Sequence, residues 1–189
     1  MFIVEGEKCV TDTIGAFELV NLIATKKWAE SHKYIVTEFS ALFLEATPEV
    51  LKKISSLSTP PEVIAIFRIP EEDTLPDISN KLVLALDGIQ DPGNLGTIIR
   101  TADWFGVDII LASKDTVDVY NPKTIQSTMG SLRRVKVYYT SLPEVIRKNK
   151  GVAIYGTLLD GVDMFKTELS NNGIIVMGNE GNGISNEMR

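Results

Sequence analysis

The sequence has only one cysteine, Cys9, and one histidine, His32, among its 189 residues. A single cysteine excludes a disulfide within the chain and is typical of a reducing compartment, so we expect a cytoplasmic protein. Cys9 has no obvious link to His32, which favours a small core residue over a nucleophile. We expect no metal site.

Long apolar runs are also lacking. No stretch approaches the roughly 18 apolar residues that a membrane helix requires, so we expect no membrane partner. The first five residues, Met1 to Glu5, lack the basic and then apolar order of a secretory signal. With 44% hydrophobic and 23% charged residues, the composition is that of a globular chain with one large domain or two small ones.

An overall excess of basic residues is absent, because the net charge is −6. Residues 1–80 hold 7 Lys and Arg against 13 Asp and Glu, whereas residues 81–189 hold 12 of each. Within the second part, basic residues cluster at 133–136 and at 147–150. An anionic partner would therefore be attracted locally, by the second part, although a solvated strand edge and helix end explain the clusters equally well.

The acidic, proline-containing segment at residues 70–77 has no periodicity and predicts a linker. We divide the chain into a first domain at residues 1–70, a linker at 71–80 and a second domain at 81–189. In the first domain the patterns predict a small α/β unit. The expected strands are 19–24, 33–36 and 63–68, and the expected helices are 7–16, 25–31 and 48–57, the last with Thr47 as its N-cap.

Strands and helices alternate in the second domain. The expected strands are 81–87, 108–112, 135–139, 152–156 and 173–177, and the expected helices are 94–105, 122–130 and 141–148. Residues 81–87 are almost continuously apolar, which is typical of a parallel strand buried on both faces. The fold class is therefore α/β with a parallel sheet. Ligands of such sheets bind beyond the carboxyl ends of the strands, which indicates the loops 87–94, 156–162 and 178–184.

Two segments carry candidate chemistry. In the first, residues 87–100, a Gly/Pro turn follows a strand, Asn94 stands where an N-cap is expected, and Arg100 lies six residues further on. An arginine near a ligand loop clamps phosphate or stabilises an oxyanion, although an exposed arginine on a capped helix is an equally good explanation.

The second segment, residues 176–185, has three glycines in six residues directly after a strand: Gly178, Gly181 and Gly183. Their order is not that of a dinucleotide-binding loop, which argues against a nucleotide-dependent oxidoreductase. Glu180 inside the loop would repel a pyrophosphate. An acidic glycine loop suits a neutral or cationic ligand, such as a sulfonium, although a tight turn into a helix is the alternative.

Together the two segments resemble the first two motifs of the SpoU, or TrmH-like, RNA methyltransferases of the SPOUT superfamily. The first is carried by Asn94-Leu95-Gly96 with Arg100, and the second by Gly178-Asn179-Glu180-Gly181 with Gly183-Ile184-Ser185. Residues 121–131 resemble the segment between them, and residues 2–8 resemble the start of an accessory RNA-binding domain similar to ribosomal protein L30e.

The resemblance implies a trefoil-knot methyltransferase domain, S-adenosyl-L-methionine as cofactor, a homodimer, and methyl transfer to a ribose 2′-hydroxyl of rRNA or tRNA. It implies catalytic roles for Arg100, Asn94 and Glu180. The cofactor would be cradled by residues of two loops: Thr157, Leu158, Gly178, Asn179 and Gly181. For the RNA we expect contacts with Arg133, Arg134 and Lys136. Because an arginine side chain stays protonated at neutral pH and is a poor base, we favour phosphate positioning over proton abstraction for Arg100.

The third motif of the family, an Ile-Pro-Met segment with a following Ser-Leu-Asn-Val turn, is absent from the sequence. Residues 184–189 are typical of the opening turn of a helix with Ser185 as its N-cap, so we expect a truncated chain with weak cofactor binding and little activity. The alternative function is a non-catalytic RNA-binding or ribosome-assembly module with a degenerate methyltransferase domain.

Overall fold

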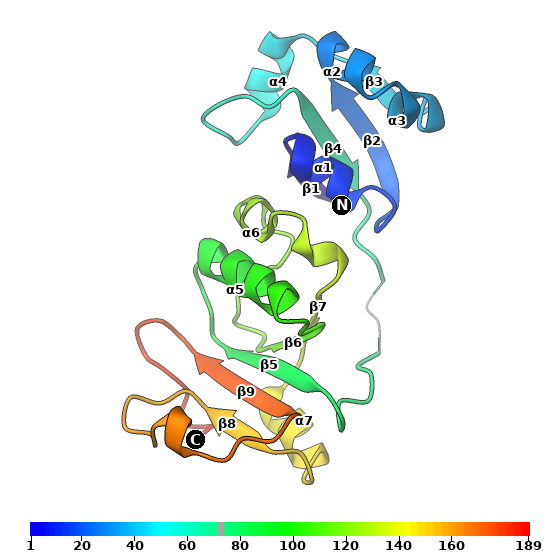
Figure 1. Cartoon of the computed structure of the whole chain (residues 1–189). Helices are drawn as coiled ribbons and strands as arrows, with labels where there is room; N and C mark the ends of the chain where they lie inside the picture. Colours follow the sequence, from blue (N-terminus) through cyan, green and yellow to red (C-terminus); the bar gives the residue numbers. More distant parts are fainter. Residues whose placement is uncertain (72–73) are drawn as a thin grey trace.

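The computed structural model describes residues 1–71 and 74–189 and contains two sheets, one in each half of the chain (Figure 1). The predicted linker, residues 71–80, includes residues 72–73, which lie outside the described residues. The second sheet is parallel throughout, so the predicted parallel-sheet α/β fold is confirmed. The trefoil knot stays a prediction.

The first sheet has the strand order β1-β4-β2-β3. Its strands are β1 (Phe2–Glu5), β2 (Leu19–Ala24), β3 (Phe43–Glu45) and β4 (Val63–Phe67), and its helices are α1 (Glu7–Thr13), α2 (Lys26–Ser31), α3 (Lys33–Glu38) and α4 (Pro48–Ile54). The strands predicted at 19–24 and 63–68 and the three predicted helices are present with small shifts of their ends. Thr47 does stand at the N-cap position of α4.

The strand predicted at residues 33–36 is wrong, because these residues form helix α3. Ile35 is buried in the first core, and Val36 and Phe39 pack against it. Ile35 and Val36 precede Phe39 by four and three residues, the spacing of one helix face. Packing therefore overrides the preference of the β-branched Ile35 and Val36 for a strand.

The second sheet has the order β7-β6-β5-β9-β8. Its strands are β5 (Leu82–Asp87), β6 (Ile109–Ala112), β7 (Lys136–Tyr139), β8 (Ile154–Gly156) and β9 (Gly173–Gly178). The helices are α5 (Pro92–Trp104), α6 (Pro122–Thr128) and α7 (Leu142–Lys148), with short 3₁₀ turns η1 (Ser131–Arg133) and η2 (Met164–Lys166). All eight elements predicted for this half are present. Residues 184–189 form a turn in which the N–H groups of Met188 and Arg189 donate to the carbonyl oxygen of Ser185, and the helix expected to begin here stays a prediction.

Helices cover both faces of this sheet. Val83 and Ala85 of β5 pack in one core with Leu142 and Val145 of α7, whereas Leu86, one position on, packs in another core with residues of α5. Successive side chains of a strand point to opposite faces, so a strand covered on both sides is apolar at every position. Figure 1 shows α5 and α6 on one side of the sheet and α7 near its other side.

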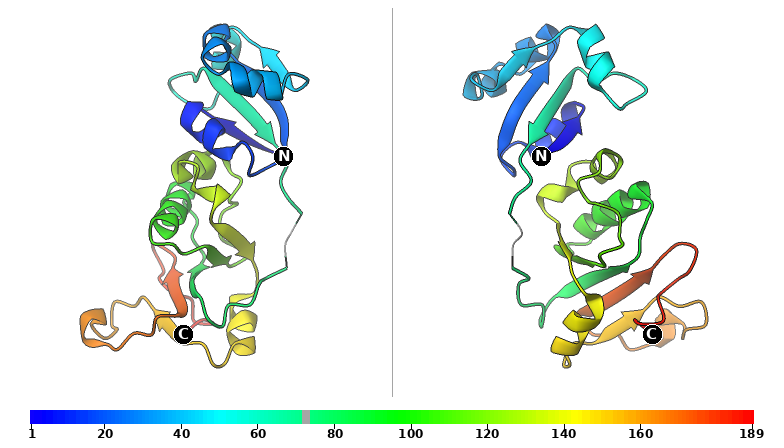
Figure 2. Two further views of the ribbon diagram at one scale, coloured as in Figure 1. Left: turned by 45° about the vertical axis from the view of Figure 1, so that its right-hand side comes forward. Right: turned by 180° about the vertical axis from the view of Figure 1, so that it is seen from behind.

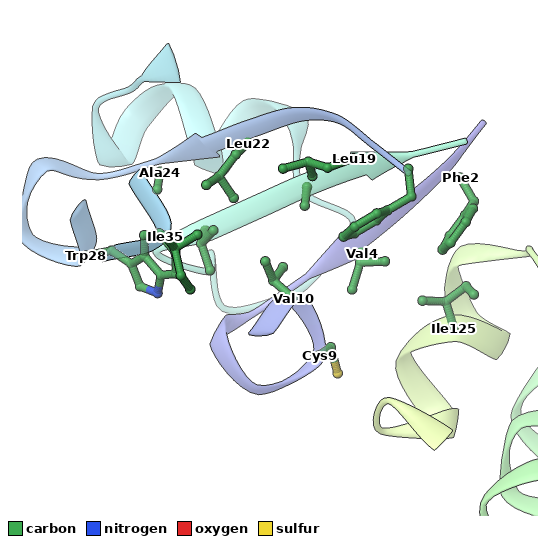
Figure 3. Close-up of a cluster of buried hydrophobic side chains, with 13 residues drawn as sticks. Phe2, Val4, Cys9, Val10, Leu19, Leu22, Ala24, Trp28, Ile35 and Ile125 are labelled. Atoms are coloured by element: carbon green, nitrogen blue, oxygen red, sulfur yellow. The ribbon is translucent and has the colours of Figure 1, made fainter. Parts of the chain in front are cut away.

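The two halves of the chain are packed against each other through α6. Ile125 of α6 belongs to the core of the first half, and the ring of Tyr120 lies 5.0 Å from that of Phe2. Figure 3 shows Ile125 pointing toward Phe2 and Cys9, and both views of Figure 2 show α6 next to the first half. Cys9 is buried in this core, as expected. The helix that carries Ile125 is therefore anchored on both sides.

Helices α5 and α6 meet at Gly96. A Cβ atom on Gly96 would lie 2.4 Å from Cβ of Ser127 and 2.6 Å from the carbonyl oxygen of Thr124, so the two helices touch at backbone distance. Only glycine permits this approach.

We expect Gly96→Ala to lower the free energy of unfolding by about 2 kcal/mol, because overpacking outweighs the gain of about 1 kcal/mol in helix propensity. The measurement is urea unfolding. Thr97→Ala, next along the helix at an exposed position, is the matched control and should change stability by less than about 0.5 kcal/mol. An unfolding midpoint of Gly96→Ala at or above that of the control would contradict the close contact.

Candidate functional site

The candidate site lies at the carboxyl ends of β5 and β9, where the chain order of the sheet reverses. From β5 the chain adds β6 and β7 on one side, then crosses to β8 at the far edge and returns with β9 beside β5. Ligands of open parallel sheets bind at such a switch point, and we call the region between the loops that follow β5 and β9 the crevice. The predicted loops 87–94, 156–162 and 178–184 all leave strands at this edge, and the contacts below bring them together.

Asp87, the last residue of β5, joins the first loop to the end of the chain. Its carboxylate is largely buried and accepts a hydrogen bond from the backbone N–H of Ser185 at 2.7 Å. The next residue, Gly88, donates its N–H to Oγ of Ser113 at 2.8 Å. Asp87 therefore fixes where the glycine loop ends relative to β5.

Asn179 organises the glycine loop. It exchanges two backbone hydrogen bonds with Gly183, at 3.0 and 2.9 Å, and its Oδ1 accepts from the N–H groups of Gly181 and Asn182. Its Nδ2 donates to the carbonyl oxygen of Gly88 at 2.8 Å. Since both its side chain and its backbone are hydrogen-bonded within the protein, Asn179 shapes the predicted cofactor loop.

Gly178 is the point at which this loop folds back on β9. A Cβ atom on Gly178 would lie 2.1 Å from the carbonyl carbon of Gly183 and 2.2 Å from the nitrogen of Ile184. No side chain fits at this distance from backbone atoms, so the loop can close in this way only with glycine at this position.

Asn94 and Glu180 meet across the crevice although they are 86 residues apart in sequence: Nδ2 of Asn94 donates to Oε1 of Glu180 at 2.9 Å. The prediction that Asn94 is the N-cap of its helix is wrong. The N-cap is Asp91, whose Oδ1 accepts from the N–H of Asn94 at 2.9 Å, and Pro92 is the first helical residue. Because Asn94 is the third residue of the helix and not its cap, its side chain is free to reach Glu180.

Both carboxylates near this contact are held in the ionised form. The hydrogen bond from Asn94, with help from backbone N–H groups, lowers the pKa of Glu180. The pKa of Asp91 is lowered by its hydrogen bonds from Lys123 and from the N–H of Asn94. At neutral pH the crevice therefore presents negative charge at the N-terminus of α5, whose dipole favours it.

Arg100 lies on α5 but does not touch the Asn94–Glu180 pair. Six residues of helix carry it about 9 Å along the axis and about 120° around it. Its side chain is exposed, and it makes no hydrogen bond or ion pair with any residue in the part of the chain that the structure describes. The arginine is therefore exposed to solvent further along α5 and is not part of the Asn94–Glu180 contact.

The loop after β8 forms the other wall. Thr157 hydrogen-bonds to the carbonyl oxygen of Val176 through both its N–H and its Oγ1, each at 3.0 Å. A Cβ atom on Gly156 would lie 3.3 Å from Cδ1 of Ile184, so this loop packs directly against the glycine loop. Leu158, the next predicted cofactor residue, is part-exposed. The loop therefore runs alongside the glycine loop, with Leu158 reachable from solvent.

The predicted RNA-contacting residues lie elsewhere. Arg134 makes two hydrogen bonds to Asp103, at 2.7 and 2.5 Å, near the far end of α5. Arg133 donates to the carbonyl oxygen of Asp12 in the first half of the chain. Together with Lys136, Arg133 lines a groove of about 740 Å³ between the two halves. The structure does not bring these three residues to the Asn94–Glu180 contact.

Sequence reasoning missed three residues that organise the site: Asp87, Asp91 and Lys123. An acid that ends a buried strand and an acid directly before a proline at a helix start are usable signals for the first two. Lys123 of α6 carries no such signal, yet its Nζ lies 3.0 Å from Oδ2 of Asp91.

Among the described residues, no cluster of three or more potential metal ligands is present. Nor does any helix formed by these residues have the length and apolar character needed to cross a membrane.

Comparison with known proteins agrees with this geometry. Residues 81–189 match the SpoU rRNA Methylase family. The chain is 32% identical over 186 residues to 23S rRNA (guanosine(2553)-2'-O)-methyltransferase RlmP of Bacillus subtilis, covering 97% of this chain and 73% of that protein. It is 31% identical over 176 residues to the 23S rRNA (uridine(2479)-2'-O)-methyltransferase of Streptomyces viridochromogenes, covering 86% of this chain but only 60% of that protein.

Solved structures give the same result. A TrmH-family protein from Porphyromonas gingivalis matches with a TM-score of 0.86 and 35% identity over 99% of this chain and 75% of its own. The SpoU methyltransferase AviRb from Streptomyces viridochromogenes, in complex with the cofactor AdoMet, matches with a TM-score of 0.83 and 26% identity over 100% and 77%.

The fold and the contacts between the loops thus define a parallel-sheet α/β protein with a candidate ligand site at its topological switch point. The chain belongs to the SpoU rRNA methylase family, so the predicted family is confirmed. The L30e-like character of the first half stays a prediction.

Proposed function

We propose that this protein transfers a methyl group from S-adenosyl-L-methionine to a ribose 2′-hydroxyl of RNA. The observation that carries the proposal is the contact of Asn94 with Glu180 across the β5–β9 crevice, formed by residues of the two family motifs. The related Bacillus and Streptomyces enzymes, named for 2'-O-methylation of 23S rRNA, support an rRNA substrate, with tRNA as the other candidate.

The residues of the crevice fit this cofactor. An ionised Glu180 in the glycine loop complements a sulfonium and disfavours a pyrophosphate. The glycine loop at Gly178, Asn179 and Gly181, with Thr157 and Leu158 on the opposite wall, would hold the cofactor, which supplies an activated methyl group when bound. The AdoMet complex of AviRb, which shares this fold, supports the assignment.

In the proposed reaction the protein acts mainly by positioning. A ribose hydroxyl is a weak nucleophile, and correct alignment of reacting atoms supplies about 7–11 kcal/mol in favourable cases. Asn94 donates through Nδ2 to Glu180, which leaves its Oδ1 to accept a hydrogen bond from the substrate hydroxyl. The proton of this hydroxyl is released to solvent when the oxygen receives the methyl group. We propose that Arg100 binds the phosphate next to the target ribose, because a guanidinium binds phosphate bidentately and is a poor base.

The experiment that tests this function is incubation of the protein with methyl-labelled S-adenosyl-L-methionine and bulk rRNA or tRNA. We expect label in RNA, and nuclease digestion should release it as a 2′-O-methylated nucleotide. Bound cofactor and bound RNA without label transfer would instead support the non-catalytic RNA-binding or assembly module.

We further propose a homodimer formed through the end of α5. Trp104 and Phe105 are 86% and 75% exposed at neighbouring positions, and large exposed apolar groups of this kind mark interaction surfaces. We expect a dimer in sedimentation experiments, with Trp104→Lys shifting it toward monomer. A monomer for the unaltered protein at high protein concentration would contradict this assignment.

The remaining assignments rest on the same proposal. The first half of the chain would bind RNA as an L30e-like domain, and Arg133, Arg134 and Lys136 would contact the RNA near the junction of the two halves. The cytoplasm, where ribosomal and transfer RNA are found, is the proposed compartment, and the reduced, buried Cys9 is compatible with it.

A further inference from the structure

Lys123 bridges the first turn of α6 and the N-cap of α5. Its Nζ lies 3.0 Å from Oδ2 of Asp91, and its backbone N–H donates at 2.9 Å to Oδ1 of Asn121, the N-cap of α6. A Cβ atom on Gly93 would lie 3.5 Å from Cε of the lysine, so the aliphatic stem lies along the 91–93 turn. The lysine thus contacts the turn from which α5 begins.

Asp91 uses its two oxygens for two different partners. Oδ1 accepts from the N–H of Asn94 at 2.9 Å, and Oδ2 accepts from Lys123 at 3.0 Å. The lysine therefore fixes the orientation of the carboxylate that caps α5. Asn94, the third residue of the helix, donates to Glu180 through its side chain and to Asp91 through its backbone N–H. The ion pair of Lys123 with Asp91 is therefore linked to the candidate catalytic contact through Asn94.

Helix α5 packs along α6, most closely at Gly96, and its middle part is buried in a core of the second sheet. Its first turn lies outside this core, since Asn94 is exposed. Lys123 and Asp91 supply a contact at this end of α5. Helix α6 is itself held in place, because its Ile125 is buried in the core of the first half of the chain (Figure 3). The ion pair therefore restrains the first turn of α5, the part of the helix that the core leaves exposed.

We propose that Lys123 is a positioning residue, which holds the first turn of α5 through Asp91 and so sets the geometry of the Asn94–Glu180 contact. The effect of Lys123 on methyl transfer rests on the proposed function, whereas its effect on the Asn94–Glu180 contact does not. The simpler alternative is an ordinary exposed ion pair with little effect, since both side chains are largely solvent-accessible.

The first test is independent of catalysis and follows the side-chain amide signals of Asn94 by ¹H–¹⁵N NMR. We expect Lys123→Met to move these signals in the direction that Glu180→Gln moves them, because both changes weaken the same hydrogen bond. Lys123→Arg should leave them near their original positions. The control is Lys81→Met, which removes the exposed pair of Lys81 with Asp108 (2.7 Å) and should not move them.

The second test measures methyl transfer. We expect Lys123→Met to lower kcat roughly tenfold with little change in the KM for cofactor, because misplacement of a positioned group lowers the rate more than binding. Lys123→Arg should restore most of the rate. Asp91→Asn should mimic Lys123→Met, and the double variant should be no worse than either single one, as for two residues that act through one contact.

The outcomes separate the two proposals. Unmoved Asn94 signals in both Lys123→Met and Asp91→Asn would overturn the positioning role, whatever the activity. Shifted signals in a protein without methyl transfer would support the positioning role and count against the proposed function. Equal losses of rate in Lys123→Met and in the Lys81→Met control would show a general effect of lost charge and overturn the proposal.

Discussion

Replacing Gly178 by alanine is expected to weaken cofactor binding by at least about 100-fold, because the change forces the loop to open by more than a side-chain adjustment. The added Cβ would meet two backbone atoms of residues 183 and 184 at 2.1 and 2.2 Å. These atoms cannot move away easily, since the loop is closed by the paired hydrogen bonds of Asn179 with Gly183 and by Asp87 with Ser185. The added methyl group would therefore clash with the backbone of the glycine loop, which forms one wall of the candidate site.

The measurement is an NMR titration with S-adenosyl-L-methionine, which also measures weak dissociation constants. Gly151→Ala is the control, because nothing lies within 4 Å of a Cβ atom at Gly151. It should bind the cofactor as the unaltered protein does. If Gly178→Ala binds the cofactor as tightly as the control, cofactor binding does not require the closed loop. The glycine loop would then not be part of the cofactor site.

The second large effect is expected for the pair formed by Asn94 and Glu180. We expect Glu180→Gln to lower the rate of methyl transfer about 100-fold or more, because a small misplacement of a positioned group has an effect of this size. The glutamine keeps the shape of the side chain and removes its charge. Asn94→Ala, which removes the donor, should have a similar effect, and the double variant should lose no more than either single one.

Single-turnover rates at saturating cofactor measure this prediction. Both residues are exposed, so the thermal midpoint of each variant should stay close to that of the unaltered protein. Glu144→Gln, an exposed acid on α7, serves as the charge-matched control. Full activity of Glu180→Gln together with reduced activity of Asn94→Ala would mean that the asparagine acts alone and that the contact between them is structural.

Much of the fold could be predicted from the sequence, because its signals are local. The apolar run at residues 82–87 predicts a strand covered on both faces, and the helices and strands after it follow as expected. The prediction failed where packing overrides local preference. Residues 33–36 favour a strand by composition but form a helix, because helical spacing places Ile35, Val36 and Phe39 on one core.

The sequence predicted which residues form the candidate site better than it predicted how they are arranged. Asn94, Glu180 and Gly178 were identified from two short motifs, and the structure places all three at one crevice. The capping role assigned to Asn94 belongs to Asp91, since a residue before Pro92 suits the N-cap and leaves Asn94 inside the helix. Arg100 is exposed further along α5 and does not contact the Asn94–Glu180 pair, which the motif could not show because its spacing fixes only a position along the helix.

The sequence by itself determined the fold class, the family and the residue types of the site, since these depend on periodicity and on motifs within short stretches. Only the tertiary structure decided which residues touch. Asn94 meets Glu180 across 86 residues, and Lys123 meets Asp91 across 32. Both contacts exist because β9 returns to lie beside β5 and because α6 packs on α5 at Gly96. Strand order and helix packing are properties of the whole chain, and no local pattern contains them.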